Sequence, residues 1–310
     1  MPLVEVVRSG FVEGHHSGSV VVLGPDGAVR DAAGVPDVPV FPRSSNKPLQ
    51  AVGMVRAGLR LDRPGLALAA ASHSGEPAHV AVVRAVLAGG GLDEDALCCP
   101  PELPLDPAAA RAVLAAGGGP ERVTMNCSGK HAAMLRTCLA AGWPGAGYLD
   151  PDHPLQVALR ATVEELTDGP VAAVGVDGCG APLFALPLTA LARAFLRLVD
   201  APAGTSERTV ADAMRAEPHL VGGTGRDVTA LTAAVPGLLA KDGAEGVYAA
   251  ALPGVGAVAV KIDDGAARAR APVMVSALRR LGVTGPALDA LAEPPVLGGG
   301  VPVGGVRTLW

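Results

Sequence analysis

Apolar, β-branched runs lie near both ends of the chain and predict the strands of a sheet. Residues 19–23 form a β-branched run, and a glycine-containing turn at 24–27 separates it from residues 28–30. This pattern is typical of a β-hairpin within a strand region that covers residues 3–32. Further strands are predicted at 246–250, 255–262 and, at the chain end, 306–309.

The middle of the chain changes to the 3.6-residue periodicity of helices. Pro48 suits a first helical turn, and apolar residues follow at helical spacing to about Gly58. Glycine triplets at 89–91 and 117–119 predict the ends of two later helices. The predicted helices cover 48–58, 76–87, 106–116, 128–141, 152–166, the region to about 214, and 266–281, and a buried strand is predicted at 171–176.

This order of elements predicts an α+β fold in a single domain of residues 1–310. The sheet is expected from about 1–40 and 240–310, and a helix-rich middle of about 44–235 is expected to pack on it. The elements do not alternate as in a regular βαβ array, and no linker divides the chain.

Charge and cysteine content exclude several classes of protein. The net charge is −5 and no basic run exceeds two residues, which argues against nucleic-acid binding. No uncharged apolar run reaches the roughly 20 residues of a membrane span, and the N-terminus lacks the pattern of a signal peptide. An odd set of five cysteines without disulfide-like spacing fits a reducing compartment. We therefore expect a soluble, cytoplasmic protein.

Lysine is scarce, which draws attention to the places that keep it. Of 25 basic residues only four are lysine, namely Lys47, Lys130, Lys241 and Lys261. Lysine can lose its proton and act as a base or ligand, whereas arginine effectively cannot. Three of the four lie in short polar stretches between apolar segments. For Lys241, a general preference for arginine explains its presence as well as a function does.

The pair Ser44 and Lys47 has the spacing of a serine nucleophile and its base. At the start of a helix, positions i and i+3 lie on one face, so the hydroxyl and the amine are within reach of each other. Serine needs a base beside it, and a desolvated lysine can serve as one. The alternative is an N-cap serine followed by a solvated lysine.

Two further segments complete a three-part pattern. Ser72 and His73 lie on a short polar loop, and Lys261 ends an apolar strand. A serine–lysine pair on a helix, a loop serine and a late-strand lysine are the elements of penicillin-binding proteins and serine β-lactamases. The match is partial, because Ile262 and Asp263 stand where threonine and glycine are expected.

Two cysteines lie at predicted turns where a metal site is plausible. Cys127 precedes Lys130 at a loop-to-helix junction, and Cys179 follows Asp177 at a strand end. Cysteine pairs held by separate turns are typical zinc ligands, and a neutral lysine nitrogen can also bind zinc. The alternative is two buried thiols that behave as small apolar side chains.

Together, five segments resemble one family, the thermolabile Rhizobium-type (class 3) L-asparaginases, over almost the whole chain. The segments are Arg43-Ser44-Ser45-Asn46-Lys47-Pro48-Leu49-Gln50, Ser72-His73-Ser74-Gly75-Glu76, Asn126-Cys127-Ser128-Gly129-Lys130-His131, Asp177-Gly178-Cys179-Gly180-Ala181-Pro182 and Lys261-Ile262-Asp263-Asp264-Gly265. The resemblance implies hydrolysis of L-asparagine to L-aspartate and ammonia by a homodimer. It also implies a fold similar to the serine β-lactamases and penicillin-binding proteins, with an antiparallel sheet and a helical subdomain.

The resemblance further implies a role for each site residue. It implies that Ser44 is the nucleophile, which forms a β-aspartyl acyl-enzyme with Lys47 as its partner. Ser72 and Lys261 would form a second serine–lysine pair. The substrate-binding residues that it implies are Arg43, His73, Glu76 and Asp177, and the implied zinc ligands are Cys127, Lys130 and Cys179. The implied Zn²⁺ assists substrate positioning and not the chemical step.

Two other functions remain open from the sequence. One is a different serine acyl hydrolase of the same fold, acting on β-lactams, D-amino peptides or esters. The other is a zinc-dependent amino-acid sensor that binds without turnover. The preference between asparagine and glutamine also remains open.

Overall fold

The computed structural model describes residues 1–310, which divide into two compact units. Unit 1 comprises Met1–Ser45, Ala185–Asp200 and Ala230–Trp310, and unit 2 comprises Asn46–Phe184 and Ala201–Thr229. Each unit is therefore assembled from segments that are distant in sequence. The single domain of residues 1–310 stays a prediction beside this division.

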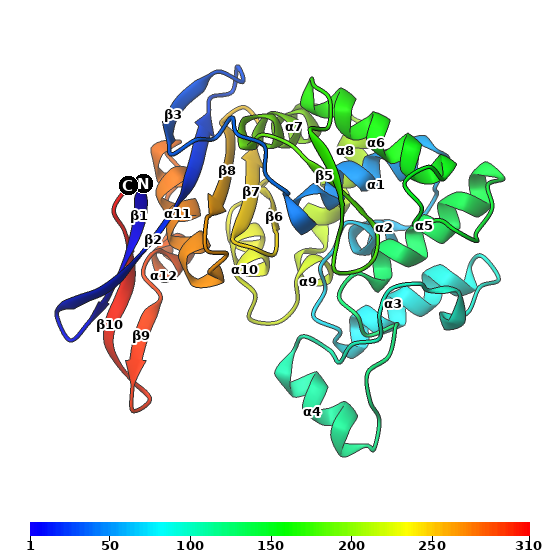
Figure 1. Ribbon diagram of the computed structural model, residues 1–310, viewed down its shortest axis with the longest axis horizontal. Coiled ribbons are helices and arrows are strands. Elements are labelled where there is room, and N and C mark those ends of the chain that lie inside the picture. The colour runs from blue at the N-terminus through cyan, green and yellow to red at the C-terminus, as the bar shows by residue number, and fades with distance from the viewer. The chain divides into compact units, whose positions relative to one another are not determined.

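Unit 1 is built on an eight-stranded antiparallel sheet (Figure 1). Its strands are β1 (Pro2–Arg8), β2 (Phe11–Leu23), β3 (Val29–Ala33), β6 (Leu239–Asp242), β7 (Val247–Leu252), β8 (Gly256–Ile262), β9 (Pro295–Gly298) and β10 (Val301–Thr308). The strand order is β6-β7-β8-β2-β1-β10-β9, with β3 paired to β2. The predictions of an α+β fold and of an antiparallel sheet from both chain ends are thus confirmed.

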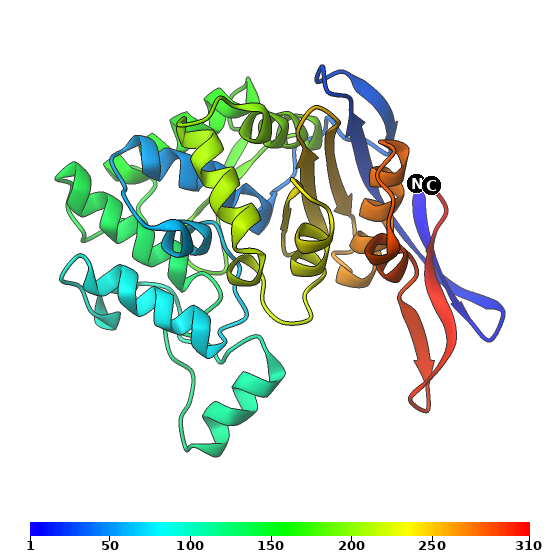
Figure 2. The ribbon, with the colours of Figure 1, turned by 180° about the vertical axis from the view of Figure 1, so that it is seen from behind.

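The centre of this sheet is almost completely buried. Nearly every residue of β7 and β8 is buried, and α7 (Leu188–Asp200) and α11 (Ala267–Arg280) pack against both strands. Both views of the ribbon show α11, in orange, lying against the sheet (Figures 1 and 2). Alanines on these strands leave room for the helices.

One glycine is required where β8 meets β2. A Cβ atom on Gly256 would lie 2.1 Å from the Leu23 carbonyl oxygen, and Gly256 has a φ of 151°. A larger residue would force the two strands apart at this point.

The sequence predicted the long elements of unit 1 and missed the short ones. The predicted strands at 246–250 and 255–262 and the predicted helix at 266–281 are confirmed as β7, β8 and α11. The strands β6 and β9 and the helix α12 (Pro286–Ala292) were not predicted. β6 has only four residues and ends in two charged ones, so it lacks the apolar run that marks a strand.

Unit 2 is mainly helical. Its helices are α1 (Lys47–Arg56), α2 (Arg63–Ala69), α3 (Pro77–Ala88), α4 (Pro107–Ala115), α5 (Ser128–Ala141), α6 (Pro154–Thr167), α8 (Ser206–Ala216) and α9 (Pro218–Val221), with a 3₁₀ turn at Glu94–Ala96. The 3₁₀ turn Arg43–Asn46 and the helix α10 (Asp227–Ala234) are each divided between the two units. The predicted helix at 128–141 is confirmed with the same bounds as α5. Among the unit 2 helices, α4 projects from the rest and buries no residue (Figures 1 and 2).

The strand predicted at 171–176 exists, but the prediction that it is buried is wrong. It forms β4 (Ala173–Val176), which pairs only with β5 (Pro182–Ala185) in a two-stranded ribbon. Every residue of β5 is buried, whereas β4 lies at the surface and its Val176 is 78% exposed. The apolar composition of this segment therefore did not reveal that the strand is exposed.

None of the helices combines the length and the apolar character that a helix needs to cross a membrane.

Candidate active site

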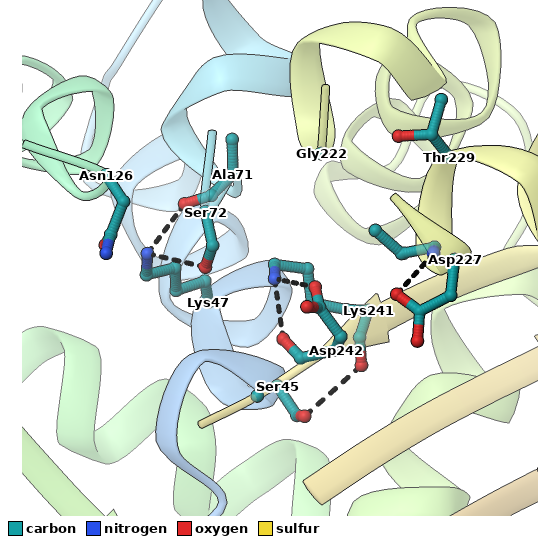
Figure 3. A network of polar contacts seen from close by, with 12 residues as sticks. Ser45, Lys47, Ala71, Ser72, Asn126, Gly222, Asp227, Thr229, Lys241 and Asp242 are labelled. Carbon is teal, nitrogen blue, oxygen red and sulfur yellow. Dashed lines mark hydrogen bonds and ion pairs between the residues drawn. The ribbon is translucent and has the colours of Figure 1, made fainter. Parts of the chain in front are cut away.

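The candidate nucleophile Ser44 lies in the tight 3₁₀ turn that closes the first segment of unit 1. Arg43 opens this turn with a φ of 51°, a left-handed backbone that costs free energy for any residue other than glycine. Within the turn, the Ser45 N–H donates to the Pro42 carbonyl at 3.1 Å. The Ser45 hydroxyl donates to the Lys241 carbonyl at 3.2 Å (Figure 3). The turn that carries Ser44 is therefore attached to the end of β6.

Lys47 begins α1 and is 1% exposed. Its ammonium group donates to the Ala71 carbonyl at 2.7 Å, to Ser72 Oγ at 3.0 Å and to Cys127 Sγ at 3.1 Å, and Figure 3 shows the two bonds to oxygen. A lysine has three N–H donors, and these three acceptors match them. The structure thus joins Lys47 to the candidate serine Ser72 in one buried serine–lysine pair.

Ser72 is held in place by its backbone as well as its side chain. It follows α2, and its N–H donates to the Val221 carbonyl at 3.1 Å. The next residue, His73, donates its N–H to the Asn126 carbonyl at 3.1 Å. The end of α9 and the segment before α5 therefore fix the backbone that carries the Ser72 hydroxyl.

The hydrogen bonds of His73 assign its protonation state. Its Nδ1 accepts the Gly75 N–H at 3.2 Å, and its Nε2 lies 2.9 Å from Ser128 Oγ. Because Ser128 Oγ already donates to the Val123 carbonyl at 2.8 Å, Nε2 must carry the hydrogen. Burial lowers the pKa of His73 well below its usual value, in agreement with a neutral ring. Both ring nitrogens act within the protein, so the geometry favours a role in holding the loop, and contact with substrate stays a prediction.

Glu76 likewise uses its carboxylate inside unit 2. Its oxygens accept the Thr224 N–H at 2.7 Å and the Thr224 hydroxyl at 3.0 Å, and His219 Nε2 lies 3.1 Å away. Burial alone would raise the pKa of Glu76, but the hydrogen bonds from Thr224 outweigh it and lower the pKa. The carboxylate therefore ties the segment around Thr224 to the loop that carries Ser72.

Cys127, Lys130 and Cys179 meet in the interior of unit 2. Cys127 caps α5, Lys130 lies one turn into that helix, and Cys179 lies in the turn between β4 and β5. All three are buried, and Lys130 Nζ lies 3.3 Å from Cys179 Sγ. A Cβ atom on Gly129 would lie 2.7 Å from the Leu68 carbonyl oxygen, so glycine lets α5 begin against α2.

The two thiols differ in protonation. A hydrogen bond with Cys179, together with burial, raises the pKa of Cys127 well above its usual value. The hydrogen bond from Cys127 and the positive charge of Lys130 lower the pKa of Cys179, although burial opposes them. Burial also works against the charge on Lys130, but the neighbouring thiols and Asp177 raise its pKa overall. These directions favour the charged form at Cys179 over Cys127, in agreement with the position of Lys130 Nζ beside Cys179 Sγ.

Asp177 shapes the turn that presents Cys179. Its carbonyl accepts the Gly180 N–H at 2.8 Å, and its Oδ1 accepts the Gly178 N–H at 2.9 Å. Gly180 has a φ of 85°, which favours glycine. The charge of Asp177 also acts on Lys130, whose pKa it helps to raise.

The sulfur and nitrogen atoms of this cluster are the candidate donors for the predicted zinc, since such donors suit Zn²⁺. No group of three or more histidine, cysteine, aspartate or glutamate side chains is arranged to hold a metal ion, and the candidate set is two sulfurs and the Lys130 amine. The adjacent His131 is buried, its Nδ1 lies 2.7 Å from the Tyr148 hydroxyl, and its ring also interacts with Cys179. Zinc at this cluster stays a prediction.

Lys261 and Arg43 both approach the turn between β6 and β7. Lys261 Nζ donates to the Glu245 carbonyl at 2.5 Å and to the Ile262 carbonyl at 2.8 Å. Arg43 Nη1 lies 3.5 Å from Glu245 Oε1. Burial lowers the pKa of Lys261. The structure thus places the Lys261 amine on one backbone carbonyl of this turn and on one at the end of β8.

Sequence reasoning gave no clear role to Lys241, which the structure places beside the Ser44 turn. Lys241 is fully buried at the end of the edge strand β6, and its amine donates to the Asp242 carbonyl at 2.6 Å and to Asp242 Oδ1 at 2.8 Å (Figure 3). Lys241, Asp242 and Gly243 keep the lysine and the glycine of the Lys-Thr-Gly element, whereas Lys261 is followed by Ile262 and Asp263. This spacing was the signal that could have identified Lys241.

Comparison with known proteins identifies the family of this chain. A model of the family described as L-asparaginase II matches residues 4–308. A search of curated proteins found no match to this chain. Because the family match covers almost every residue of both units, the chain belongs to the L-asparaginase II family.

Proposed function

We propose that this L-asparaginase hydrolyses the side-chain amide of L-asparagine by serine–lysine chemistry through a β-aspartyl acyl-enzyme. Membership of the L-asparaginase II family supports the proposed reaction. The observation that carries the mechanism is the buried hydrogen bond of 3.0 Å from Lys47 Nζ to Ser72 Oγ. A lysine enclosed with a serine hydroxyl in the interior is an arrangement that can activate a nucleophile.

Ser44 is the proposed nucleophile, because it lies in the 3₁₀ turn directly before the helix that Lys47 begins. Residues three apart at such a junction share one face. Lys47 in its neutral form takes the proton of Ser44, and Ser72, hydrogen-bonded to Lys47, relays protons within the same pair. Backbone N–H groups near the start of α1 are suited to stabilising the oxyanion.

The proposed reaction has two balanced steps. The Ser44 oxygen forms a bond to the amide carbon of asparagine, the C–N bond breaks, and the proton taken by Lys47 passes to the leaving nitrogen to give ammonia. Water then gives a proton to the same serine–lysine network and attacks the ester carbon. The ester C–O bond breaks, L-aspartate leaves and Ser44 regains its proton.

Lys241 is the residue that we propose as the lysine of the third element. It ends an edge strand and is followed by Asp242 and Gly243. Ser44, Ser72 and Lys241 then reproduce the helix, loop and strand elements of serine β-lactamases and penicillin-binding proteins. This supports the proposal of a fold similar to theirs. The role of Lys261 in a second pair with Ser72 stays a prediction.

Cys127, Lys130 and Cys179 are the proposed zinc ligands, with Asp177 beside them and Arg43 as a further candidate for substrate contact. When bound, Zn²⁺ would supply a Lewis acid that helps to orient the substrate. The expected effect of Cys127→Ala is a loss of bound zinc and a raised apparent KM, measured by metal analysis and by kinetics. Unchanged zinc content would remove Cys127 from the set of ligands.

We also propose a homodimer in a reducing compartment such as the cytoplasm. Five cysteines without a disulfide support the compartment. The mass in solution, measured by light scattering, tests the dimer, and a monomer at all concentrations would refute it.

The decisive experiment measures ammonia released from L-asparagine by the wild type, Ser44→Ala and Ser72→Ala, with L-glutamine in parallel. We expect Ser44→Ala to lower turnover by about 10⁴-fold or more while the protein stays folded. If Ser44→Ala keeps turnover within tenfold of the wild type, Ser44 is not the nucleophile and Ser72 takes its place. No turnover by folded wild type, with or without added zinc, would favour an acyl hydrolase, tested with nitrocefin, or a sensor.

A further inference from the structure

Asp242 is a buried carboxylate shared between two cations. Its residue is 3% exposed. Its Oδ1 accepts from Lys241 Nζ at 2.8 Å, and its Oδ2 accepts from Arg270 Nη2 at 3.0 Å. Buried carboxylates need such partners, because an uncompensated charge in the interior is costly. Asp242 thereby links the Lys241 amine to the helix α11, which carries Arg270.

Arg270 also binds the backbone that follows β6. Its Nη1 donates to the Gly243 carbonyl at 2.8 Å, and its guanidinium carbon lies 5.6 Å from the centroid of the Tyr248 ring. The side chain is only 11% exposed. A planar guanidinium fixed at two ends and packed near an aromatic ring has little freedom to move.

The end of β6 touches the turn that carries Ser44. The Ser45 hydroxyl donates to the Lys241 carbonyl. A Cβ atom on Gly243 would lie 2.8 Å from the Pro42 carbonyl oxygen and 2.9 Å from Ser45 Oγ. No side chain fits at Gly243, so the backbone of the turn and the backbone of the strand end are in direct contact.

We propose that Arg270 and Asp242 are positioning residues of the reaction, which hold the Lys241 amine and the Ser44 turn at fixed positions relative to each other. This inference rests on the proposed function of Ser44. A displacement of the strand end moves both groups, because Asp242 holds the amine and the Lys241 carbonyl holds Ser45. Ion pairs in the interior add little net stability compared with apolar residues of the same size, so fixing geometry is the better account of this arrangement.

The test is the kinetics of Arg270→Ala with and without free guanidinium at a concentration that does not denature the protein. We expect kcat to fall by about 30- to 100-fold, because a displacement of about 1 Å can cost that much, while KM stays within about threefold. Guanidinium should restore kcat by about tenfold, since the lost group is a guanidinium filling a defined place. A residue needed only for stability would show no such rescue once the variant is folded.

Arg279→Ala is the matched control. Arg279 lies on the same helix, and its guanidinium pairs with Asp289. We expect an unchanged kcat and no response to guanidinium. If Arg270→Ala is insoluble, Arg270→Lys replaces it, with an expected loss in kcat of about tenfold because lysine cannot hold both acceptors in a planar fork.

The outcomes separate this inference from the proposed function. If Ser44→Ala abolishes turnover and the folded Arg270 variant keeps kcat within threefold of the wild type, the positioning role is overturned and Ser44 stays the nucleophile. A loss that guanidinium does not restore in folded Arg270→Ala also overturns it. If Ser44→Ala keeps turnover, the proposed nucleophile fails, whatever Arg270 does.

Discussion

Two buried lysines, Lys47 in unit 2 and Lys241 in unit 1, meet different partners. The hydrogen bonds of Lys47 reach a carbonyl, a hydroxyl and a thiol, and the thiol belongs to Cys127. Lys241 donates to the carboxylate of Asp242, which also binds Arg270. The first set contains groups that exchange protons, and the second contains an ion pair fixed from a neighbouring helix.

The difference shows that burial alone does not define the role of a lysine. A hydroxyl next to an amine gives the proton a place to go, as acid–base chemistry requires. A carboxylate held in a salt bridge keeps an ammonium group charged and in place, as electrostatic stabilisation requires. We therefore expect Lys47 to transfer protons and Lys241 to supply a positioned positive charge.

The largest effect that tests this contrast is expected from Lys47. Lys47→Met should lower kcat by about 10⁴-fold, and Lys47→Arg by nearly as much, because arginine keeps the charge but does not accept a proton. Ammonia release under substrate saturation measures both variants, and thermal melting checks that they are folded. A kcat for Lys47→Arg within tenfold of the wild type would remove proton transfer from the role of Lys47.

A smaller loss of kcat is expected at Lys241, and arginine should replace lysine better there than at Lys47. Lys241→Met should lower kcat by about 100-fold, the cost of one donor at a developing oxyanion. Lys241→Arg should recover about a tenth or more of wild-type kcat, because the charge remains. The same assay compares the two variants. Equal losses in both would mean that Lys241, like Lys47, acts through its proton.

The smallest effect concerns stability and leaves both lysines untouched. Glu76 is held by Thr224, and its pKa is lowered below the usual value of 4.5. A lowered pKa in the folded state means that the stabilisation is complete above pH 4.5 and is lost as the pH falls through the folded-state pKa. Glu76→Gln should therefore lower the free energy of unfolding by about 1 kcal/mol at neutral pH.

Urea unfolding of the wild type and Glu76→Gln between neutral and acidic pH measures this effect. The difference between the two proteins should shrink as the pH falls below that usual value. Glu13→Gln is the control, because Glu13 pairs with Arg8 at the surface and such pairs contribute little. A difference that is constant with pH would contradict a role for the Glu76 charge.

Long elements of the fold were predictable from sequence, and the short ones were not. The helix α5 has the apolar spacing, the N-terminal polar residues and the terminal Gly142 that define a helix. β6 has four residues, and only its pairing with β7 makes it a strand. β4 has an apolar composition, but its exposure depends on what covers it, which no local pattern contains.

The candidate site was predictable where its residues lie close together in the sequence. Cys127 and Lys130 are one helical turn apart, so their proximity follows from the helix. The approach of Cys179 to Lys130 depends on how the β4–β5 turn packs, so the residues alone offered it as one of two alternatives and the resemblance to a family implied it. Lys241 lies in β6 and Lys261 in β8. The lysine and glycine spacing at the end of β6 was a local signal for Lys241, and the contact of the Ser44 turn with the Lys241 carbonyl, which no local pattern contains, supports that choice.

The scarcity and burial of lysine also decide how this protein responds to amine-reactive reagents. Lys47, Lys130 and Lys241 are each at most 2% exposed, and Lys261 has its amine on two backbone carbonyls. Lys261, which is half-buried, is then the most accessible lysine for acylation. Polymer attachment or immobilisation through lysine would therefore leave the surface of unit 2 unmodified, because both lysines of that unit are buried.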